Sequence, residues 1–253
     1  MCLVAIAYHV DPQFPLIAAG NRDEFHARPT QDSHWWPDHP EILGGRDLQA
    51  GGTWLAVQRN GRFATVTNFR DAQEESGKLR SRGHLVAEFL ESDIAPCTYL
   101  KSIDGGAYAG FNLLVADATS LAYLSNRGGG LRELPPGIYG LSNAALDAPW
   151  HKVRQSKTAL GELIDGNAVN ETNLMRLLNE RDKAPATEVK SERLSFVQAH
   201  ALTATFIVHP EYGTRCSTAL TMSKSGDVRF LERRFDPAGE ATGESRFAFM
   251  IGD

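Results

Sequence analysis

Strand-like and helix-like segments occur in blocks along this chain, in the order strands, helices, strands, helices and strands. A doubly wound parallel sheet needs strict alternation of strands and helices, which this order lacks. Turn signals such as Asn60-Gly61, which joins two apolar runs, instead favour antiparallel hairpins. We therefore predict an α+β fold in which two mainly antiparallel sheets pack together with helices outside. No linker or internal repeat divides residues 1–253, which we expect to form a single domain.

The predicted strands share apolar or alternating residues bounded by turn residues. They are Leu3–Val10, Pro15–Ala19, Trp54–Gln58, Arg62–Phe69, Phe111–Ala116, Leu121–Ser125, Gly137–Ser142, Thr205–Val208, Arg215–Ser223, Val228–Phe235 and Phe247–Ile251. The predicted helices share apolar residues at helical spacing, and they are Ser81–Ser92, Tyr99–Ile103, Trp150–Ile164 and Asn170–Leu178. The proline-rich segment Arg28–Glu41 and the polar segment Lys183–Ser195 are predicted to be loops.

Charge and composition exclude several functions. With a net charge of −5 at pH 7, the chain lacks the basic surface by which proteins bind nucleic acids. No apolar run of about 18 residues is present, so we do not expect an integral membrane protein. The three cysteines are far apart and the histidines lack metal-ligand spacing, so we expect no disulfide framework, metal site or resident cofactor. This cysteine usage, with no basic segment at the N-terminus, indicates a cytoplasmic protein.

Cys2 carries the most distinctive chemistry in the chain. Methionine aminopeptidases remove Met1 when the next residue is small, and cysteine qualifies. Removal leaves a thiol nucleophile and a free α-amino group on one residue, and such an amine can act as the base for its own side chain. The alternative is that Cys2 is a small buried hydrophobic residue at the start of a strand.

The segment Asn21-Arg22-Asp23-Glu24 directly follows the second predicted strand. If the first two strands form a hairpin, the end of the second lies beside the start of the first. This geometry brings Arg22 and Asp23 near Cys2, where an arginine favours a thiolate and a carboxylate orients the amine. The alternative is an ordinary solvated turn.

Three further segments place polar residues at strand ends. Asn68 ends one strand in Thr67-Asn68-Phe69, and Asn143 ends another in Gly140-Leu141-Ser142-Asn143. Acyl transfer needs neutral donors that face the developing oxyanion, and asparagine amides or backbone N–H groups supply them. Arg215 lies among hydroxyl residues at the start of a late strand. The alternatives are caps, turns and a surface ion pair.

These motifs together resemble the NRDE family (transport and Golgi organisation 2 protein-like). The resemblance spans most of the chain, in order, and the motifs that carry it are Met1-Cys2-Leu3, Asn21-Arg22-Asp23-Glu24, Gly52-Thr53-Trp54, Thr67-Asn68-Phe69-Arg70, Gly140-Leu141-Ser142-Asn143 and Tyr212-Gly213-Thr214-Arg215. It implies an N-terminal-nucleophile hydrolase-like fold, which is a four-layer αββα sandwich. It also implies an association with haem trafficking, lipid metabolism and secretory organisation.

The chain is also distantly similar to choloylglycine hydrolases and penicillin V acylases. That similarity implies that Cys2 is nucleophile and base, that Asp23 contacts the amine, and that Arg215 is a partner of the thiol. It further implies that Asn143 and the Asn68-Phe69 turn form the oxyanion hole. In those acylases an arginine stands a few residues before the aspartate. Here Gly20 falls near that place, and Arg22 is adjacent to Asp23.

Two functions of different classes follow from these motifs. The first is a hydrolase that cleaves a linear amide or a thioester of a small acyl compound. The alternative is a non-catalytic carrier that binds haem or a lipid-like ligand in an apolar pocket. The pocket of such a carrier would be lined by the aromatic residues Trp35, Trp36, Trp54 and Phe69. A third reading is a scaffold that keeps the fold without any chemistry.

Overall fold

The computed structural model describes residues 2–69, 79–189, 191 and 194–252, so Met1 and Arg70 of the sequence motifs lie outside the described residues. One antiparallel sheet has six strands in the order β10 (Gly137–Leu141), β1 (Cys2–Tyr8), β2 (Leu16–Phe25), β11 (Tyr212–Met222), β12 (Asp227–Phe235) and β13 (Ala241–Met250). The other has seven strands in chain order, namely β3 (Thr30–Trp35), β4 (Ile42–Asp47), β5 (Leu55–Gln58), β6 (Phe63–Asn68), β7 (Phe111–Ala116), β8 (Leu121–Ser125) and β9 (Gly130–Leu134).

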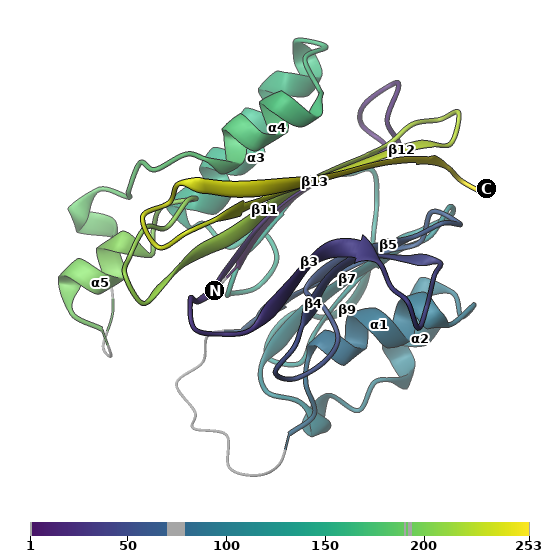
Figure 1. Cartoon of the computed structure of the whole chain (residues 1–253), viewed down its shortest axis with the longest axis horizontal. Helices are drawn as coiled ribbons and strands as arrows, with labels where there is room; N and C mark the ends of the chain where they lie inside the picture. The colour runs from purple at the N-terminus through teal and green to yellow at the C-terminus, as the bar shows by residue number, and fades with distance from the viewer. Residues whose placement is uncertain (1, 70–78, 190, 192–193, 253) are drawn as a thin grey trace.

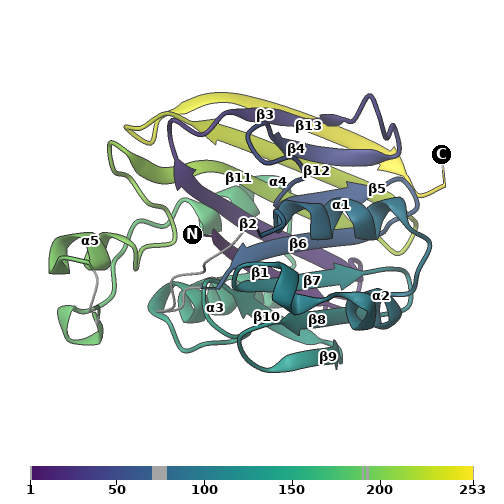
Figure 2. The same cartoon turned by 90° about the horizontal axis from the view of Figure 1, so that it is seen from below.

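The helices α1 (Gly83–Glu91), α2 (Pro96–Ser102), α3 (His151–Asp165) and α4 (Glu171–Leu178) cover the outer faces of the sheets. The structure also contains α5 (Phe196–Ala201) and short 3₁₀ turns at Gly105–Ala107 and Ala186–Glu188. Figure 1 shows the layers in the order α3 and α4, six-stranded sheet, seven-stranded sheet, α1 and α2. Figure 2 shows α1 and α2 lying across the seven-stranded sheet, with α5 at the far end of the molecule. The predicted α+β class and four-layer arrangement are confirmed.

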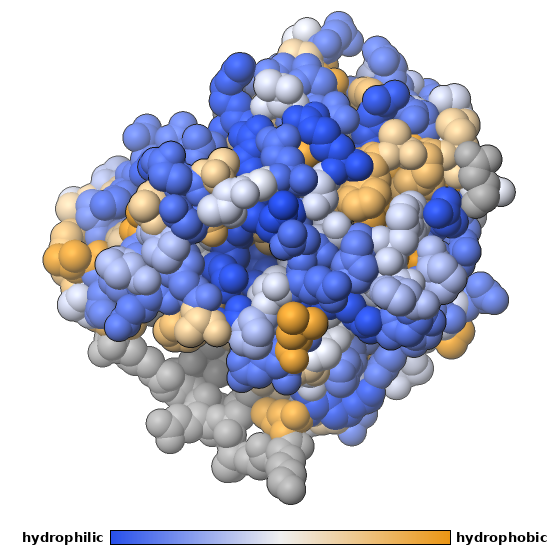
Figure 3. Space-filling view, viewed as in Figure 1, coloured by the Kyte–Doolittle hydropathy of each residue, from blue (hydrophilic) through white to orange (hydrophobic). Residues whose placement is uncertain are grey.

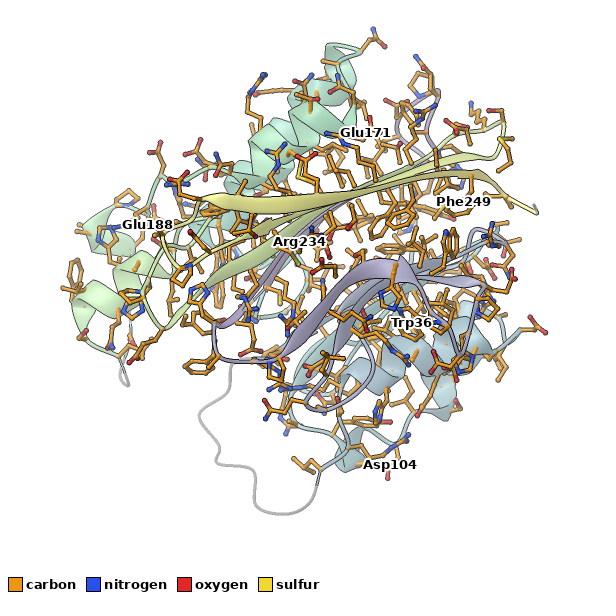
Figure 4. All side chains as sticks on the ribbon, in the orientation of Figure 1. Trp36, Asp104, Glu171, Glu188, Arg234 and Phe249 are labelled. Carbon is orange, nitrogen blue, oxygen red and sulfur yellow. The ribbon has the colours of Figure 1, made fainter. Side chains whose placement is uncertain are left out.

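Alternation along β1 assigns its side chains to two different layers. Val4 and Ile6 belong to the apolar cluster between the sheets, whereas Ala5 and Ala7 belong to the cluster beneath α3 and α4. Side chains from both sheets fill the space between them (Figure 4). Cys2 has the same parity as Val4, so its side chain lies on the inner face of the six-stranded sheet.

Helix α3 approaches the sheet closely because Gly140 has no side chain. A Cβ atom at Gly140 would lie 2.7 Å from Cγ1 of Val153 and 3.0 Å from Cγ of Lys157. Helix α3 contacts both β10 and β1, which extends this close packing to the strand that begins at Cys2. The glycine of the Gly140-Leu141-Ser142-Asn143 motif therefore has a packing role.

Two segments were assigned the wrong type of secondary structure from the sequence. The segment Arg28–Glu41 contains the edge strand β3, whose half-exposed polar residues lack the apolar pattern of an interior strand. Thr205–Val208 was predicted as a strand and is not one, although Thr205, Phe206 and Ile207 are buried. The N–H of Phe206 donates to the carbonyl of Glu180, so burial there comes from loop packing.

Other differences concern short elements. The predicted loop Lys183–Ser195 contains a 3₁₀ turn, and α5 follows it without having been predicted. Strands β4 and β9 were also missed, because their glycines and charged residues weaken the apolar pattern. Among the described residues, no helix has both the length and the apolar character needed to cross a membrane.

We predict that Gly140→Val destabilises the protein by about 1–3 kcal/mol, because the new side chain overlaps Val153 and Lys157. Thermal unfolding followed by circular dichroism measures the effect. Gly161→Ala on α3 is the matched control, since its Cβ would meet only Ile138 at an ordinary 3.5 Å. An unchanged melting temperature for Gly140→Val would contradict the packing role of Gly140.

Candidate active site

Cys2 and Arg22 are direct cross-strand partners at one end of the β1–β2 hairpin. Paired residues of an antiparallel ladder project to the same face, so the thiol and the guanidinium both lie on the inner face of the sheet. Cys2 is half-buried, whereas Arg22 is only 4% exposed. In Figure 3, hydrophilic residues dominate the surface around the place where Figure 1 marks the N-terminus.

Three contacts hold the Arg22 guanidinium in place. Its Nη1 donates to Oγ1 of Thr30 at 2.9 Å, and its Nη2 lies 3.7 Å from Oδ2 of Asp47. Its Cζ lies 4.4 Å from the ring centroid of Trp54, which is a cation–π distance. These contacts fix a buried positive charge beside Cys2.

The position of Trp54 depends on the glycine two residues before it. Gly52 has φ +70°, and a Cβ atom there would lie 2.3 Å from the carbonyl carbon of Gly83. The N–H of Thr53 donates to the carbonyl of Gly83 at the start of α1. The Gly52-Thr53-Trp54 motif therefore joins α1 to the wall of the site.

Asp23 lies on the opposite face of the sheet from the thiol. Its side chain is 1% exposed, and Oγ1 of Thr214 donates to its Oδ1 at 2.8 Å. Burial raises the pKa of Asp23, and the positive charge of Lys152 opposes that increase. The backbone nitrogen of Cys2 starts β1 between these two faces, so an α-amine at that nitrogen could face both thiol and carboxylate.

Asn143 and Asn68 come together at the same end of the sheet. Strand β10 pairs with β1 so that Leu141 opposes Val4, and continuing this register brings position 143 opposite Cys2. The Asn143 Nδ2 donates to the carbonyl of Asn68 at 2.7 Å. The N–H of Phe69 in the Asn68-Phe69 turn donates to the carbonyl of Gly110. The side-chain amides of Asn68 and Asn143 are therefore the better candidates for donors to a ligand.

A buried polar network supports the loop that carries Asn143. Oγ of Ser142 donates to the carbonyl of Cys2 at 2.8 Å, and Oγ1 of Thr67 donates to the carbonyl of Ser142 at 2.6 Å. Asn112 accepts from the Tyr123 hydroxyl and donates to the carbonyl of Ala144. Sequence reasoning missed Asn112, because a lone asparagine within an apolar run carries no motif that distinguishes it from an ordinary strand residue.

Two cavities meet at this place. The Cys2 cavity has a volume of about 300 Å³, and its lining includes Cys2, Arg22, Asp23, Trp54, Asn68 and Arg82. The apolar chamber beside it has a volume of about 530 Å³, and its lining includes Phe25, Phe69, Asn143, Leu202, Ile207 and Tyr212. Asn68 and Arg82 line both cavities, so the polar and the apolar space are neighbours.

Arg215 lies on the neighbouring strand β11 and is not among the residues that line the Cys2 cavity. The register between β2 and β11 shifts between Thr214 and Cys216, so Arg215 is the extra residue of a β-bulge. Its Nη1 donates to the carbonyls of Phe25 and Arg28 at 2.8 and 3.1 Å. Arg215 lines a separate cavity of about 220 Å³ rather than the Cys2 cavity.

Cys216 and Glu232 lie beside Arg215 on the inner face of the sheet. Burial and the charge of Glu232 raise the pKa of the Cys216 thiol well above its ordinary range. Both residues are buried, and Cys216 opposes Arg22 in the ladder. A thiol in this environment stays protonated.

The four aromatic residues considered for an apolar ligand pocket do not gather in one cavity. Trp36 is fully buried in the cluster beneath α1, and Trp35 packs against Phe249 of β13. Trp54 lines the Cys2 cavity, and Phe69 lines the apolar chamber. Within the described residues, no group of three or more His, Cys, Asp or Glu side chains is arranged to hold a metal ion.

Solved structures with similar folds are N-terminal-nucleophile hydrolases. The Caenorhabditis elegans ortholog of N-acylethanolamine-hydrolyzing acid amidase has a TM-score of 0.52 at 12% identity, over 87% of this chain and 92% of that chain. The C2A mutant of the conjugated bile acid hydrolase from Clostridium perfringens has a TM-score of 0.54 at 8% identity, over 99% and 92%. At these sequence identities, the similarity to the two solved structures shows a shared fold.

Sequence comparison identifies the family. A family model described as Transport and Golgi organisation 2 matches residues 1–237. The Transport and Golgi organization protein 2 homologs of Bos taurus and Homo sapiens are each 34% identical, with 92% of this chain and 92% of each relative covered. The Drosophila melanogaster protein of the same name is 28% identical over 95% of both chains. This chain therefore belongs to the Transport and Golgi organisation 2 family and has the N-terminal-nucleophile hydrolase fold.

Proposed function

We propose that this protein is a cysteine N-terminal-nucleophile hydrolase that cleaves a linear amide or a thioester of a small acyl compound, once Met1 is removed. The observation that carries the proposal is the placement of Cys2 at the start of β1. Its side chain shares the inner face with Arg22, and Asp23 lies just across the sheet. An amine at this strand end has a nucleophile on one side and an orienting carboxylate on the other.

In the proposed reaction, the α-amine of Cys2 accepts the thiol proton, and the sulfur attacks the carbonyl carbon of the substrate. The buried charge of Arg22 stabilises the thiolate, while Asp23 orients the amine. The amine then delivers its proton to the leaving nitrogen or sulfur as the tetrahedral intermediate collapses. Water, activated by the same amine, cleaves the acyl-enzyme and regenerates the thiol.

The amides of Asn143 and Asn68 are proposed to bind the oxyanion. Asn143 is 1% exposed, and its Nδ2 uses one hydrogen on the Asn68 carbonyl, which leaves a second for the ligand. Donors fixed in this way need no reorganisation when charge develops in the transition state. The Ser142 hydrogen bond to the carbonyl of Cys2 ties this donor loop to the nucleophile's own backbone.

The two neighbouring cavities suggest how the substrate is oriented. The apolar chamber suits the acyl group, because its lining is mainly aliphatic and aromatic. The Cys2 cavity, which contains Arg22, Arg28 and Arg82, suits a polar leaving group. The scissile carbonyl would then lie at Asn68, which lines both cavities.

We predict that protein with Cys2 as its first residue is acylated by the thioester of octanoic acid with N-acetylcysteamine. Intact-mass spectrometry would show one octanoyl adduct that hydrolyses with time, and Cys2→Ala would abolish it. Cys97→Ala is the matched control, because Cys97 lies near Glu133 and away from both cavities. If protein with a free Cys2 amine forms no adduct, the hydrolase proposal fails and the ligand carrier becomes the better explanation.

Asn143→Ala is predicted to lower kcat for this thioester by about 10²–10³-fold, since the loss of one oxyanion donor has that typical effect. Steady-state hydrolysis gives kcat, and circular dichroism melting reports whether the fold is retained. Asn173→Ala on α4, remote from the cavities, is expected to leave kcat unchanged. A folded Asn143→Ala protein with normal kcat would remove Asn143 from the proposed oxyanion hole.

A further inference from the structure

A lysine is buried on the side of the sheet opposite the thiol. Lys152 belongs to the first turn of α3, and its side chain is only 1% exposed. Removing an ammonium group from water is unfavourable unless an opposite charge or hydrogen-bond acceptors compensate. The proposed reaction described above does not use Lys152, so its burial calls for a separate explanation.

Contacts made by Ser156, one helical turn further along α3, indicate the direction in which Lys152 faces. Ser156 follows Lys152 by four residues and therefore shares its helix face. Its Oγ lies 3.5 Å from Oγ1 of Thr205, and the carbonyl of Thr205 accepts from Nδ2 of Asn21 at 2.8 Å. The turn of α3 that carries Ser156 is therefore level with Asn21 on β2.

The same spacing brings Lys152 level with Asp23. Asn21 and Asp23 are two residues apart on one face of β2, a separation of about 6.7 Å along a strand. Ser156 and Lys152 are four residues apart along the helix, a separation of about 6 Å. Both Lys152 and Asp23 are 1% exposed, and the charge of Lys152 acts on the Asp23 carboxylate across this buried layer.

The charged groups around this pair come from several elements. At Asp23, burial raises the pKa, and the charge of Lys152 and the hydrogen bond from Thr214 lower it. Glu24 acts in the opposite direction. Lys152 also lines a cavity of about 250 Å³, and the lining of this cavity includes Glu188 and His151. Glu188 is already paired with Arg154, Nη2 to Oε2, at 2.8 Å.

We propose that Lys152 is a positioning residue that shares the Asp23 carboxylate with the α-amine of Cys2, so that Asp23 orients this amine without holding a proton on it. This inference rests on the proposed function. A lone buried carboxylate would stabilise the ammonium form of the amine, and an ammonium group cannot accept the thiol proton. A second cation on the same carboxylate offsets that effect and leaves the amine available as the base.

The test measures the amine directly. Protein labelled with ¹⁵N- and ¹³C-cysteine is released from a fusion by a protease that leaves Cys2 as the first residue. NMR then gives the pH midpoint at which the Cys2 amine titrates. In Lys152→Met we expect the midpoint to rise by about one pH unit, because a nearby positive charge has been removed. Lys152→Arg keeps the charge and is expected to titrate near the wild-type midpoint.

Two further variants serve as controls. Ser156 lies on the same helix face as Lys152, and Ser156→Ala changes no charge, so we expect it to leave the titration midpoint of the amine unchanged. Lys152→Gln replaces the charge by a polar group, and it gives the same comparison if Lys152→Met fails to fold. An unchanged midpoint in the folded uncharged variant, or a shift of equal size in Lys152→Arg, would overturn the role of Lys152.

Hydrolysis of the octanoyl thioester separates this inference from the proposed function. If both hold, kcat/KM of Lys152→Met falls several-fold at neutral pH and recovers as pH rises, whereas a purely structural defect lowers it at every pH. A shifted amine midpoint in protein that never forms the octanoyl adduct would support the charge-sharing role and reject the hydrolase. An amine midpoint equal to that of the wild type in a Lys152→Met protein that still hydrolyses the thioester would support the hydrolase and reject the charge-sharing role of Lys152.

Discussion

The register of the β1–β2 hairpin is the constraint on which the rest of the site depends. Because Cys2 opposes Arg22, thiol and guanidinium share the inner face, and Asp23 is forced to the outer face by simple alternation. A slip of one residue would exchange these faces. Each face then has its own support: Trp54 and Asp47 hold Arg22, while Thr214 donates to Asp23.

Local sequence signals were sufficient for the fold class and for the expectation that Arg22 and Asp23 lie near Cys2. Two apolar runs with a short turn between them predict the hairpin, and the hairpin places the end of one strand beside the start of the other. Arg22 and Asp23 could therefore be placed near Cys2 from the sequence alone. The glycines of two motifs, Gly52 and Gly140, have packing roles that become visible only when α1 and α3 are in position.

The sequence was less informative wherever burial arises from distant elements. Lys152 is a charged residue at a helix start, which ordinarily faces water, and only the packing of α3 on the sheet buries it. Asn112 interrupts an apolar strand, and its partners lie on other strands and on the loop after β10. Thr205–Val208 has the composition of a strand but forms no continuous ladder: the N–H of Phe206 donates to the carbonyl of Glu180, and Ile207 bonds to the backbone N–H and the hydroxyl of Thr214. Such residues take their roles from tertiary contacts that no local pattern encodes.

The bulge in β11 has a consequence for the whole outer layer. After the bulge, Cys216 faces the inner side, and Ser217 faces outward to Asn21. In an unbroken ladder Thr214 would have the same parity as Cys216 and would also face inward. The one extra residue reverses that parity, so a single strand contributes a thiol to the interior and a hydroxyl to Asp23. If Arg215 paired within the ladder instead of forming the bulge, it would oppose Asp23 in place of Thr214, and the carboxylate would lose its hydroxyl donor although β1 and β2 kept their register.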